Sequence, residues 1–492
     1  MVTDEGDDRR PAVRPTADDP FVAALSPSVG GPAGEHAGRH PWWTPVRVIL
    51  AMTAVCFALG MVQKAPCYDA QWTNSQSRYS EMCYSDLPYL YVGRGFAELE
   101  WPYSDSIYVR DRYPDVMEYP VGISYYAYAA AYVTHWLEGS PDLAARGAMS
   151  QGQLYADHEV LRETLLFTAV NSVGFGICAL LAAWALTGVN RRRPWDAALF
   201  ALSPVLLFEG LINWDLLAVA CVAGALWAQA RDRPALTGVL IGLGTAVKLY
   251  PLFLLGGLLV IWGRERRWRD LATATGTGLL TWALVNAPAY LSGHHEWSVF
   301  WTFNKYRGAD LGSAWLVIEQ MAYGTTYTHH TINLWSWILF GLWCVGVAVL
   351  GVRAPRTPRL AQLGFLVVVG FLLVNKVYSP QYALWLLPLA VMARPRWRDQ
   401  LIWQAGEIYY FASVWWYLGT YLNPSGGGDP GFYWLAVGIR CAAQLYLAVI
   451  VVRDILMPEY DVVRTRPAGA RHSFWPPTEP GRLTLGRAPG GG

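Results

Sequence analysis

The chain has 492 residues, of which 53% are hydrophobic and only 15% are charged, against about 25% charged residues in an ordinary soluble protein. With 25 tryptophans and a net charge of +1, this composition excludes a string of soluble domains, a disordered chain and an obvious nucleic-acid-binding protein. It predicts an all-α, polytopic membrane protein, because a helix satisfies its own backbone hydrogen bonds in lipid.

Apolar runs place a transmembrane domain at residues 42–457, between two polar tails. The tails, 1–41 and 458–492, are rich in proline and glycine, and we expect both to be disordered. A segment at 120–137 either crosses the membrane or lies along its surface, so we expect 11–13 helices in all. The other spans are expected at 43–63, 161–189, 196–212, 215–230, 271–290, 332–352, 360–376, 380–393, 401–421 and 431–452.

One further apolar run, 235–262, has arginines at both ends and should therefore cross the membrane an even number of times. It is too short for two full crossings, which need about 40 residues. We therefore expect a short helical hairpin that turns at 248–251, where Pro251 interrupts the helix. Irregular backbone at this depth is tolerated where it lines a wet cavity.

Arginine and lysine are distributed differently along the chain. Fifteen arginines and no lysine lie in the short loops 190–195, 231–234, 263–269, 353–359 and 394–398. The positive-inside rule makes these loops cytoplasmic, and both termini with them, in a multi-pass cell-membrane protein. The opposite side carries a large first extracytoplasmic loop at 64–119, with nine acidic and five basic residues. The excess of arginine over lysine, 34 to 4, also indicates a high-GC, actinobacterial genome.

All four lysines, at positions 64, 248, 305 and 376, fall on the extracytoplasmic side or at the hairpin turn. A lysine at the end of an apolar helix often only extends toward the membrane surface. A compact ammonium also suits a phosphate, and a phosphate at the outer membrane surface implies a lipid phosphate or pyrophosphate. We therefore expect Lys248, with Lys376 and Lys305, to bind a donor phosphate.

The first loop supplies two candidate general bases, Asp69 in CYDAQW and Asp86 in CYSDLPYLY. A general base must reach a hydroxyl proton within hydrogen-bond distance. Asp86 is equally well placed to cap the helix that follows it. Cys67 and Cys83 lie in the same loop, and the oxidising side of the membrane favours a disulfide between them over two free thiols.

Polar residues within apolar runs are the next candidates, because they usually face a cavity or a partner at such depth. Asn213 and Asp215 lie at the junction of two spans, although Asp215 is also a candidate N-cap. Aromatic residues of the outer loops, such as Trp301 and Phe303, either form an interfacial belt or stack on a sugar.

The order of these motifs resembles the GT-C superfamily of membrane glycosyltransferases and, within it, glycosyltransferase family 87. The matching stretches are YSDLPYLYVGRGF, MEYPVG, LINWDLLAVA, AVKLYPLFLL and NKVYSPQYALWLLP, within residues 43–452. The resemblance implies a GT-C-type helical bundle and an α-(1→2)-mannosyltransferase-like activity that uses polyprenyl-phosphate mannose.

By position, Asp86 corresponds to the family's loop-one base, while Lys248 and Tyr250 correspond to its Lys-x-Tyr-Pro motif at the donor phosphate. Asp69 stays a second candidate for the base. The remaining candidates, all for substrate binding, are Glu118, Tyr119, Asn213, Asp215, Tyr378 and Gln381.

The expected partners are a polyprenyl-phosphate sugar, a lipid or glycan acceptor and membrane lipid. Lysines that neutralise a leaving monophosphate require no metal, so we expect no cofactor, with a divalent cation held by Asp69, Asp86 and Glu118 as the alternative. The competing function is a polytopic transporter or flippase of lipids or oligosaccharides, although the chain shows no clear internal repeat.

Overall fold

The computed structural model describes residues 19–25, 42–74, 76–114, 117–322, 324–423 and 430–465. Over these residues the chain is 75% helical and contains no strand, so the protein has the predicted all-α, polytopic membrane fold. Most of both predicted tails lies outside the described residues. The exceptions are a short helix, α2 (Pro20–Leu25), and the turn-rich residues 458–465.

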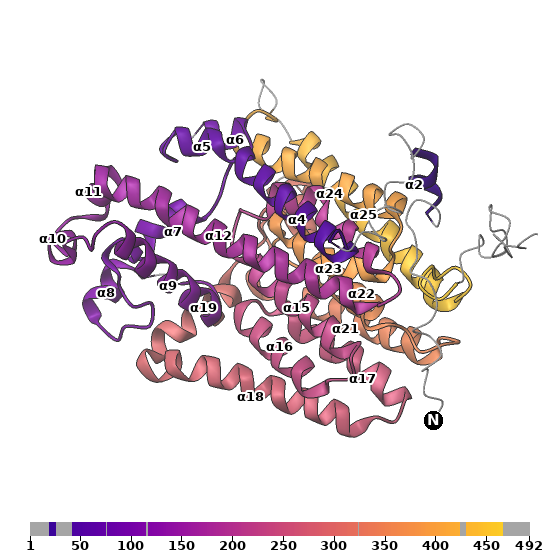
Figure 1. The fold of residues 1–492 in the computed structure, drawn as a ribbon. Coiled ribbons are helices and arrows are strands. Elements are labelled where there is room, and N and C mark those ends of the chain that lie inside the picture. The colour runs from indigo at the N-terminus through magenta and orange to yellow at the C-terminus, as the bar shows by residue number, and fades with distance from the viewer. Residues whose placement is uncertain are drawn as a thin grey trace, which may run out of the picture.

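Within the described ranges, four helices are long and apolar enough to cross a membrane: α4 (Pro45–Gln63), α12 (His158–Val189), α21 (His329–Arg353) and α25 (Gly431–Leu456). Shorter apolar helices pack among them (Figure 1). These are α15 (Asp215–Gln229), α16 (Pro234–Val247), α17 (Leu254–Arg264), α22 (Leu360–Val374) and α23 (Ala383–Ala393). The expected total of 11–13 helices stays a prediction.

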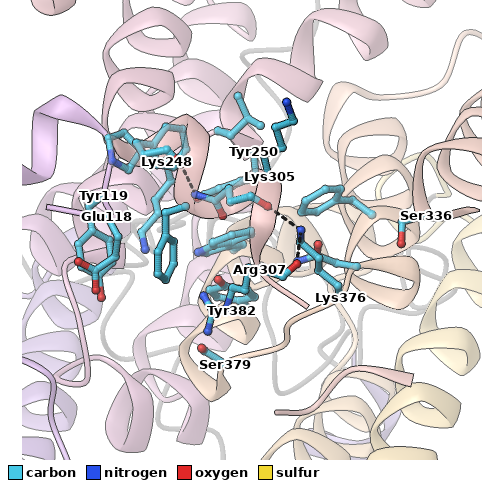
Figure 2. Close-up of a pocket in the computed structure, with 18 of the residues that line it drawn as sticks. Glu118, Tyr119, Lys248, Tyr250, Lys305, Arg307, Ser336, Lys376, Ser379 and Tyr382 are labelled. Carbon is cyan, nitrogen blue, oxygen red and sulfur yellow. Dashed lines mark hydrogen bonds between the residues drawn. The ribbon is translucent and has the colours of Figure 1, made fainter. Parts of the chain in front are cut away.

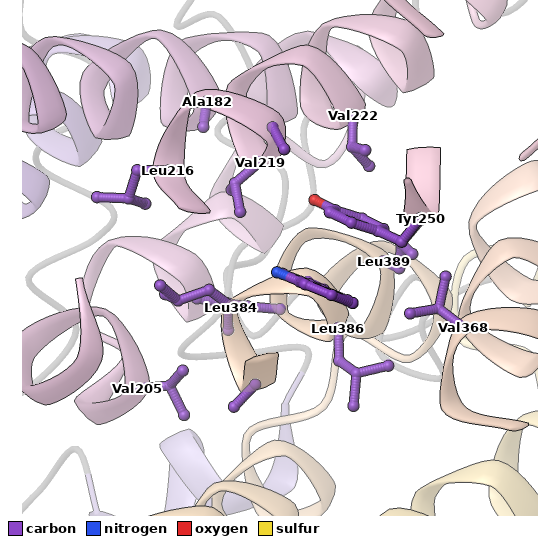
Figure 3. Close-up of a cluster of buried hydrophobic side chains, with 14 of the residues drawn as sticks. Ala182, Val205, Leu216, Val219, Val222, Tyr250, Val368, Leu384, Leu386 and Leu389 are labelled. Carbon is purple, nitrogen blue, oxygen red and sulfur yellow. The ribbon is translucent and has the colours of Figure 1, made fainter. Parts of the chain in front are cut away.

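The centre of the bundle is formed by α22 and α23. Every residue of α23 is buried, and so are nearly all residues of α22, as expected for helices that are apolar on all sides. Tyr250 extends into this core and stacks on Trp385, with ring centres 4.7 Å apart and planes 6° apart. Figure 3 shows Tyr250 among aliphatic side chains of α15, α22 and α23.

The predicted hairpin is present, with its interruption at the expected residues. Helix α16 ends at Val247, Lys248 is extended, and the chain resumes as a 3-10 turn, η5 (Tyr250–Phe253), that leads into α17. On its other face α16 packs closely on α18 (Trp268–Ser292). A Cβ added at Gly242 would lie 2.2 Å from the carbonyl oxygen of Gly278, so this crossing depends on glycine.

The single span expected at 196–212 is wrong, because the chain is broken there into short helices. Ser203 caps a new start with its hydroxyl, which accepts from the Leu206 N–H, and Pro204 occupies the first helical position. The pieces are η4 (Pro194–Ala197), α13 (Ala198–Ala201) and α14 (Pro204–Glu209). Helix α14 ends at Glu209, and residues 210–214 form a non-helical connection that reaches the site described below.

The large first loop, residues 64–119, is itself helical, and Cys67 and Cys83 form a disulfide within it. Its helices lie to one side of the bundle (Figure 1). An ion pair between Arg146 and Glu163, at 2.6 Å, ties the following segment to α12. The elements of this part are α5 (Ala65–Asp69), α6 (Ser77–Ser80), α7 (Leu87–Gly93), η3 (Phe96–Glu98), α8 (Ile107–Arg112), α9 (Val121–Leu137), α10 (Leu143–Gly147) and α11 (Gln151–Ala156).

The ambiguous segment 120–137 is one helix, α9, and whether it crosses the membrane stays a prediction. Two further helices lie between the spans expected at 271–290 and 332–352: α19 (His294–Tyr306) and α20 (Ala314–Met321). The remaining elements are η6 (Pro380–Tyr382) and α24 (Trp397–Leu418).

Candidate active site

A cavity of about 570 Å³ lies where the first loop, the 210–214 connection, the α16–η5 turn, α19, α21 and α22 converge. Figure 2 shows its polar lining. Most of the residues proposed from the sequence meet here, although they are far apart in the chain. The cavity is lined by Asp86, Glu118, Tyr119, Asn213, Lys248, Tyr250, Lys305, Lys376 and Gln381.

Asp86 lies at the start of α7, but its carboxylate caps no backbone N–H of that helix. Instead the Asn213 side-chain amide donates to Asp86 Oδ2 at 2.6 Å and to the Tyr119 hydroxyl at 2.9 Å. The Asp86 backbone N–H also donates to the Ile212 carbonyl at 2.9 Å. The 210–214 connection therefore fixes Asp86 with two hydrogen bonds, one to its carboxylate and one from its backbone N–H.

Burial raises the pKa of the Asp86 carboxyl above its usual value. Hydrogen bonds from Asn213 and Tyr84 and the charge of Lys248 oppose this rise, while the charge of Glu118 adds to it. Glu118 is itself paired with Arg94, whose Nη2 lies 2.8 Å from Glu118 Oε2. Asp86 is thus a partly shielded carboxylate with a raised pKa, which is the condition a general base requires.

Lys248 is placed by the turn at the end of α16. Its Nζ lies 3.4 Å from Asp215 Oδ1 and 5.0 Å from the centre of the Tyr119 ring. Asp215 is fully buried in the first turn of α15 and also accepts from the Trp385 indole at 2.6 Å. The carboxylate of Asp215 thereby holds the ammonium in place while leaving it at the cavity wall, where an anion can approach it.

Lys376, on the opposite wall, is held differently. Its Nζ donates to the carbonyls of Asn304 and Arg307, at 2.6 and 2.8 Å, and to Asn333 Oδ1 at 2.7 Å, as the dashed lines in Figure 2 show. Burial, aided by the charge of Arg307, lowers the pKa of Lys376 to about 8. An ammonium has three hydrogens, and all three are engaged. Lys376 therefore ties the segment after α19 to α21, and this geometry does not favour the phosphate role expected of it.

Lys305 is exposed on α19 at the cavity, with its ammonium 5.3 Å from the Tyr306 ring centre. Arg307 also lines the cavity and pairs with Asp310, whose Oδ2 accepts from Nε at 2.9 Å. Arg307 was not singled out from the sequence, because the phosphate ligands were sought among the four lysines. Its position two residues after Lys305 was the available signal.

Four proposed residues do not contribute a polar group to the cavity, and one of them is Asp215, the buried partner of Lys248 described above, which is not part of the lining. Asp69 is exposed on α5 and is not part of the lining. Tyr378 is buried in the bundle, where its hydroxyl donates to Glu407 Oε2 at 2.8 Å. Tyr250 reaches the cavity wall, but its buried ring packs on Trp385 and its hydroxyl has no hydrogen-bond partner among the described residues.

The other side of the cavity is an apolar wall, of which the sequence singled out only Phe303. Its members come from α19, α21 and α22, and most lie in runs that read as ordinary membrane spans. They are Phe300, Phe303, Trp337, Phe340, Phe371 and Val374.

Among the described residues, no group of three or more His, Cys, Asp or Glu side chains is placed to hold a metal ion. The alternative cation site also lacks one proposed ligand, since Asp69 lies outside the cavity. That transfer proceeds without a metal stays a prediction.

Comparison with known proteins gives one result. The model of Glycosyltransferase family 87 matches residues 159–375, which include Asn213, Asp215, Lys248 and Lys305 but neither Asp86 nor Lys376. No curated protein matches the chain.

Proposed function

We propose that this protein, a glycosyltransferase by its match to family 87, transfers a sugar from a polyprenyl-phosphate donor to a lipid or glycan acceptor. The reaction takes place at the extracytoplasmic face of the cell membrane, with Asp86 as the general base. Mannose is the sugar we propose. The match gives no support to the alternative of a transporter or flippase.

The observation that carries the proposal is the pairing of Asp86 and Lys248 in one cavity. Tyr119 lies between them, because its hydroxyl receives a hydrogen bond from Asn213 while its ring faces the Lys248 ammonium. Glycosyl transfer from a phosphate donor needs a group that accepts a proton and a group that neutralises the leaving phosphate. Asp86 and Lys248 supply these two groups, and both line the same cavity.

Asp86, Lys248 and Lys305 together account for the proton and the charge that move in the reaction. Asp86 takes the proton of an acceptor hydroxyl as that oxygen forms a bond to the anomeric carbon. The bond from the anomeric carbon to the phosphate oxygen breaks, and the polyprenyl phosphate leaves with the bonding electrons. Lys248, with the exposed Lys305 at the cavity, neutralises the charge that develops on that oxygen.

The apolar wall supports a lipid donor. Trp337 is 58% exposed and extends from a candidate membrane span, whereas Phe340, one turn along α21, is buried at the cavity. A path of aromatic side chains therefore runs from the outer surface of α21 into the site. A polyprenyl chain can lie along such a path while its phosphate reaches the polar wall.

The proposal is tested with purified protein in liposomes, supplied with a panel of polyprenyl-phosphate sugars and with nucleotide sugars. We expect transfer from polyprenyl-phosphate mannose to a lipid or glycan acceptor, with no transfer from nucleotide sugars. Addition of EDTA should leave the rate unchanged. Transfer from nucleotide sugars alone would contradict the proposed donor, and loss of activity with EDTA would contradict the metal-free mechanism.

A further inference from the structure

The candidate active-site cavity has one arginine in its described lining, Arg307, and the transfer step proposed above does not use it. Arg307 directly follows α19, and its side chain is 31% exposed, so a ligand in the cavity can reach it. The guanidinium carbon lies 5.4 Å from the centre of the Phe303 ring, which belongs to the apolar wall. Arg307 therefore lies where the apolar wall meets the polar lining. In a polyprenyl-phosphate sugar, the phosphate has the corresponding position between the hydrocarbon chain and the sugar.

Hydrogen bonds hold the chain segment that carries Arg307 against the connection between α22 and η6. The Asp310 N–H donates to the Lys376 carbonyl at 2.8 Å. The Tyr378 N–H donates to the Leu311 carbonyl, also at 2.8 Å. In addition, the Lys376 ammonium donates to the Arg307 carbonyl at 2.8 Å. The backbone at Arg307 is thus fixed before a ligand arrives, and binding does not have to order it.

Asp310 orients the guanidinium of Arg307 through one edge only. Asp310 Oδ2 accepts from Arg307 Nε at 2.9 Å and from Nη2 at 2.5 Å, while Oδ1 accepts from the Leu311 N–H at 2.7 Å. A guanidinium has five N–H groups, and Asp310 accepts from only two of them. No described residue accepts a hydrogen bond from Nη1. The arrangement parallels that of Lys248, which Asp215 holds at 3.4 Å while the ammonium stays at the cavity wall.

Arg307 and Lys248 act on the same two tyrosines of the cavity. The Lys248 ammonium lies 5.0 Å from the centre of the Tyr119 ring. The charges of Lys248 and Arg307 both act on the Tyr382 hydroxyl, and Figure 2 shows Arg307 beside Tyr382. Burial lowers the pKa of Arg307, but Asp310 and the two tyrosines outweigh burial and raise this pKa above its usual value. Two cations of different shape, a compact ammonium and a planar fork, therefore face one part of the cavity.

We propose that Arg307 binds the non-bridging oxygens of the donor phosphate with two parallel hydrogen bonds, while Lys248 neutralises the oxygen that leaves with the polyprenyl phosphate. The inference rests on the proposed function, in which the donor is a polyprenyl-phosphate sugar. Arginine suits this role because its planar fork matches two phosphate oxygens, whereas an ammonium acts as a point charge. Arg307 takes up no proton and forms no covalent bond during transfer. Its role is to make the site specific for a lipid that carries a phosphate.

The test measures how tightly the full chain, purified in detergent, binds labelled polyprenyl-phosphate mannose and labelled polyprenol, which has no phosphate. Arg307→Gln should weaken binding of polyprenyl-phosphate mannose by about tenfold or more, because the bidentate contact is lost. The same variant should bind polyprenol with wild-type affinity. A residue that only supports the shape of the cavity would instead affect both lipids.

Arg267→Gln is the matched control. Arg267 is also 31% exposed, and it also pairs with an aspartate three residues later, Asp270, at 2.7 Å. It does not line the candidate active-site cavity. Its replacement should therefore leave the affinity for polyprenyl-phosphate mannose unchanged. Thermal unfolding of both variants shows whether they fold.

The proposal is overturned if Arg307→Gln binds polyprenyl-phosphate mannose as tightly as the wild type does. It is also overturned if that variant loses as much affinity for polyprenol, or if Arg267→Gln loses as much affinity for the donor. Should Arg307→Gln not fold, modification of the wild-type protein with phenylglyoxal, which reacts with arginine, decides the question. Bound polyprenyl-phosphate mannose should protect Arg307 and not Arg267. Equal modification of Arg307 with and without the donor overturns the proposal.

Failure of this inference can be distinguished from failure of the proposed function. If the wild-type protein binds no polyprenyl-phosphate sugar, the proposed function itself is wrong. If the wild-type protein binds the donor and Arg307→Gln binds it equally well, only the role of Arg307 is wrong.

Discussion

The two walls of the candidate active-site cavity each carry a buried lysine, but the two lysines have different partners. Lys248 and Lys376 are 8% and 9% exposed, so burial does not distinguish them. Lys248 faces one carboxylate and an aromatic ring, whereas Lys376 donates all three ammonium hydrogens to two carbonyls and one side-chain amide oxygen. The difference teaches that the partners of a buried lysine, rather than its depth, indicate whether it can bind a ligand.

The same contrast separates the two aspartates of the first loop. Asp86 lies in the cavity with Asn213 as its hydrogen-bond donor, and Asp69 is exposed on α5. We expect Asp86→Asn to lower the transfer rate by about 10³-fold, within the range for loss of a general base. Asp69→Asn is the matched control and should transfer at close to the wild-type rate in the liposome assay. Equal losses of transfer rate in both variants would show that Asp86 and Asp69 do not differ in their role.

Lys248→Met is expected to have the next largest effect. Removal of the ammonium leaves the leaving phosphate without its counter-charge, so kcat/KM for the donor should fall by about 10²-fold. Steady-state kinetics over a range of donor concentrations measure this change. A donor KM and a kcat that both match the wild-type values would show that the phosphate lies elsewhere.

Asn213→Ala sharpens the assignment of the proton acceptor. The amide stabilises the ionised form of Asp86, so its removal should raise the pKa of that carboxyl further. Since only the ionised carboxylate accepts a proton, activity rises with pH through this pKa. The acidic limb of the pH–rate profile should therefore move to higher pH, with a loss of about tenfold near neutrality. If the acidic limb does not move, its pKa belongs to a group other than Asp86.

Lys376→Met should have the smallest effect on catalysis and a clear effect on stability. The loss of a charged group with three hydrogen bonds is expected to cost about 2 kcal/mol of unfolding free energy. Transfer should fall by less than about tenfold, mainly through KM, because the segment after α19 loses its tie to α21. Thermal unfolding and kinetics are measured together. A large kinetic defect with unchanged stability would mean that Lys376 binds the donor directly.

The sequence predicted the polar side of the site because polar residues stand out within apolar runs. Asn213 and Asp215 could be recognised in this way, and so could the turn at 248–251, where Lys248 and Pro251 interrupt a helix. The apolar wall could not be recognised, because Phe340 and Phe371 differ from lipid-facing residues only after the helices pack.

Two other features also required the tertiary structure. Asp69 and Asp86 occur in similar local sequences, and only the path of the 210–214 connection distinguishes them. The break in 196–212 has a local signal, Ser203 followed by Pro204. Hydropathy alone nevertheless predicts one continuous span there.

The most direct test of the division of labour between Asp86 and Lys248 is the affinity of Asp86→Asn and Lys248→Met for a labelled polyprenyl-phosphate sugar. We predict that Asp86→Asn binds the donor within about threefold of the wild-type affinity, because it lacks only the proton acceptor. Lys248→Met should bind about tenfold more weakly or worse, because it lacks the phosphate partner. The reverse result, with weak binding by Asp86→Asn and normal binding by Lys248→Met, would contradict the account.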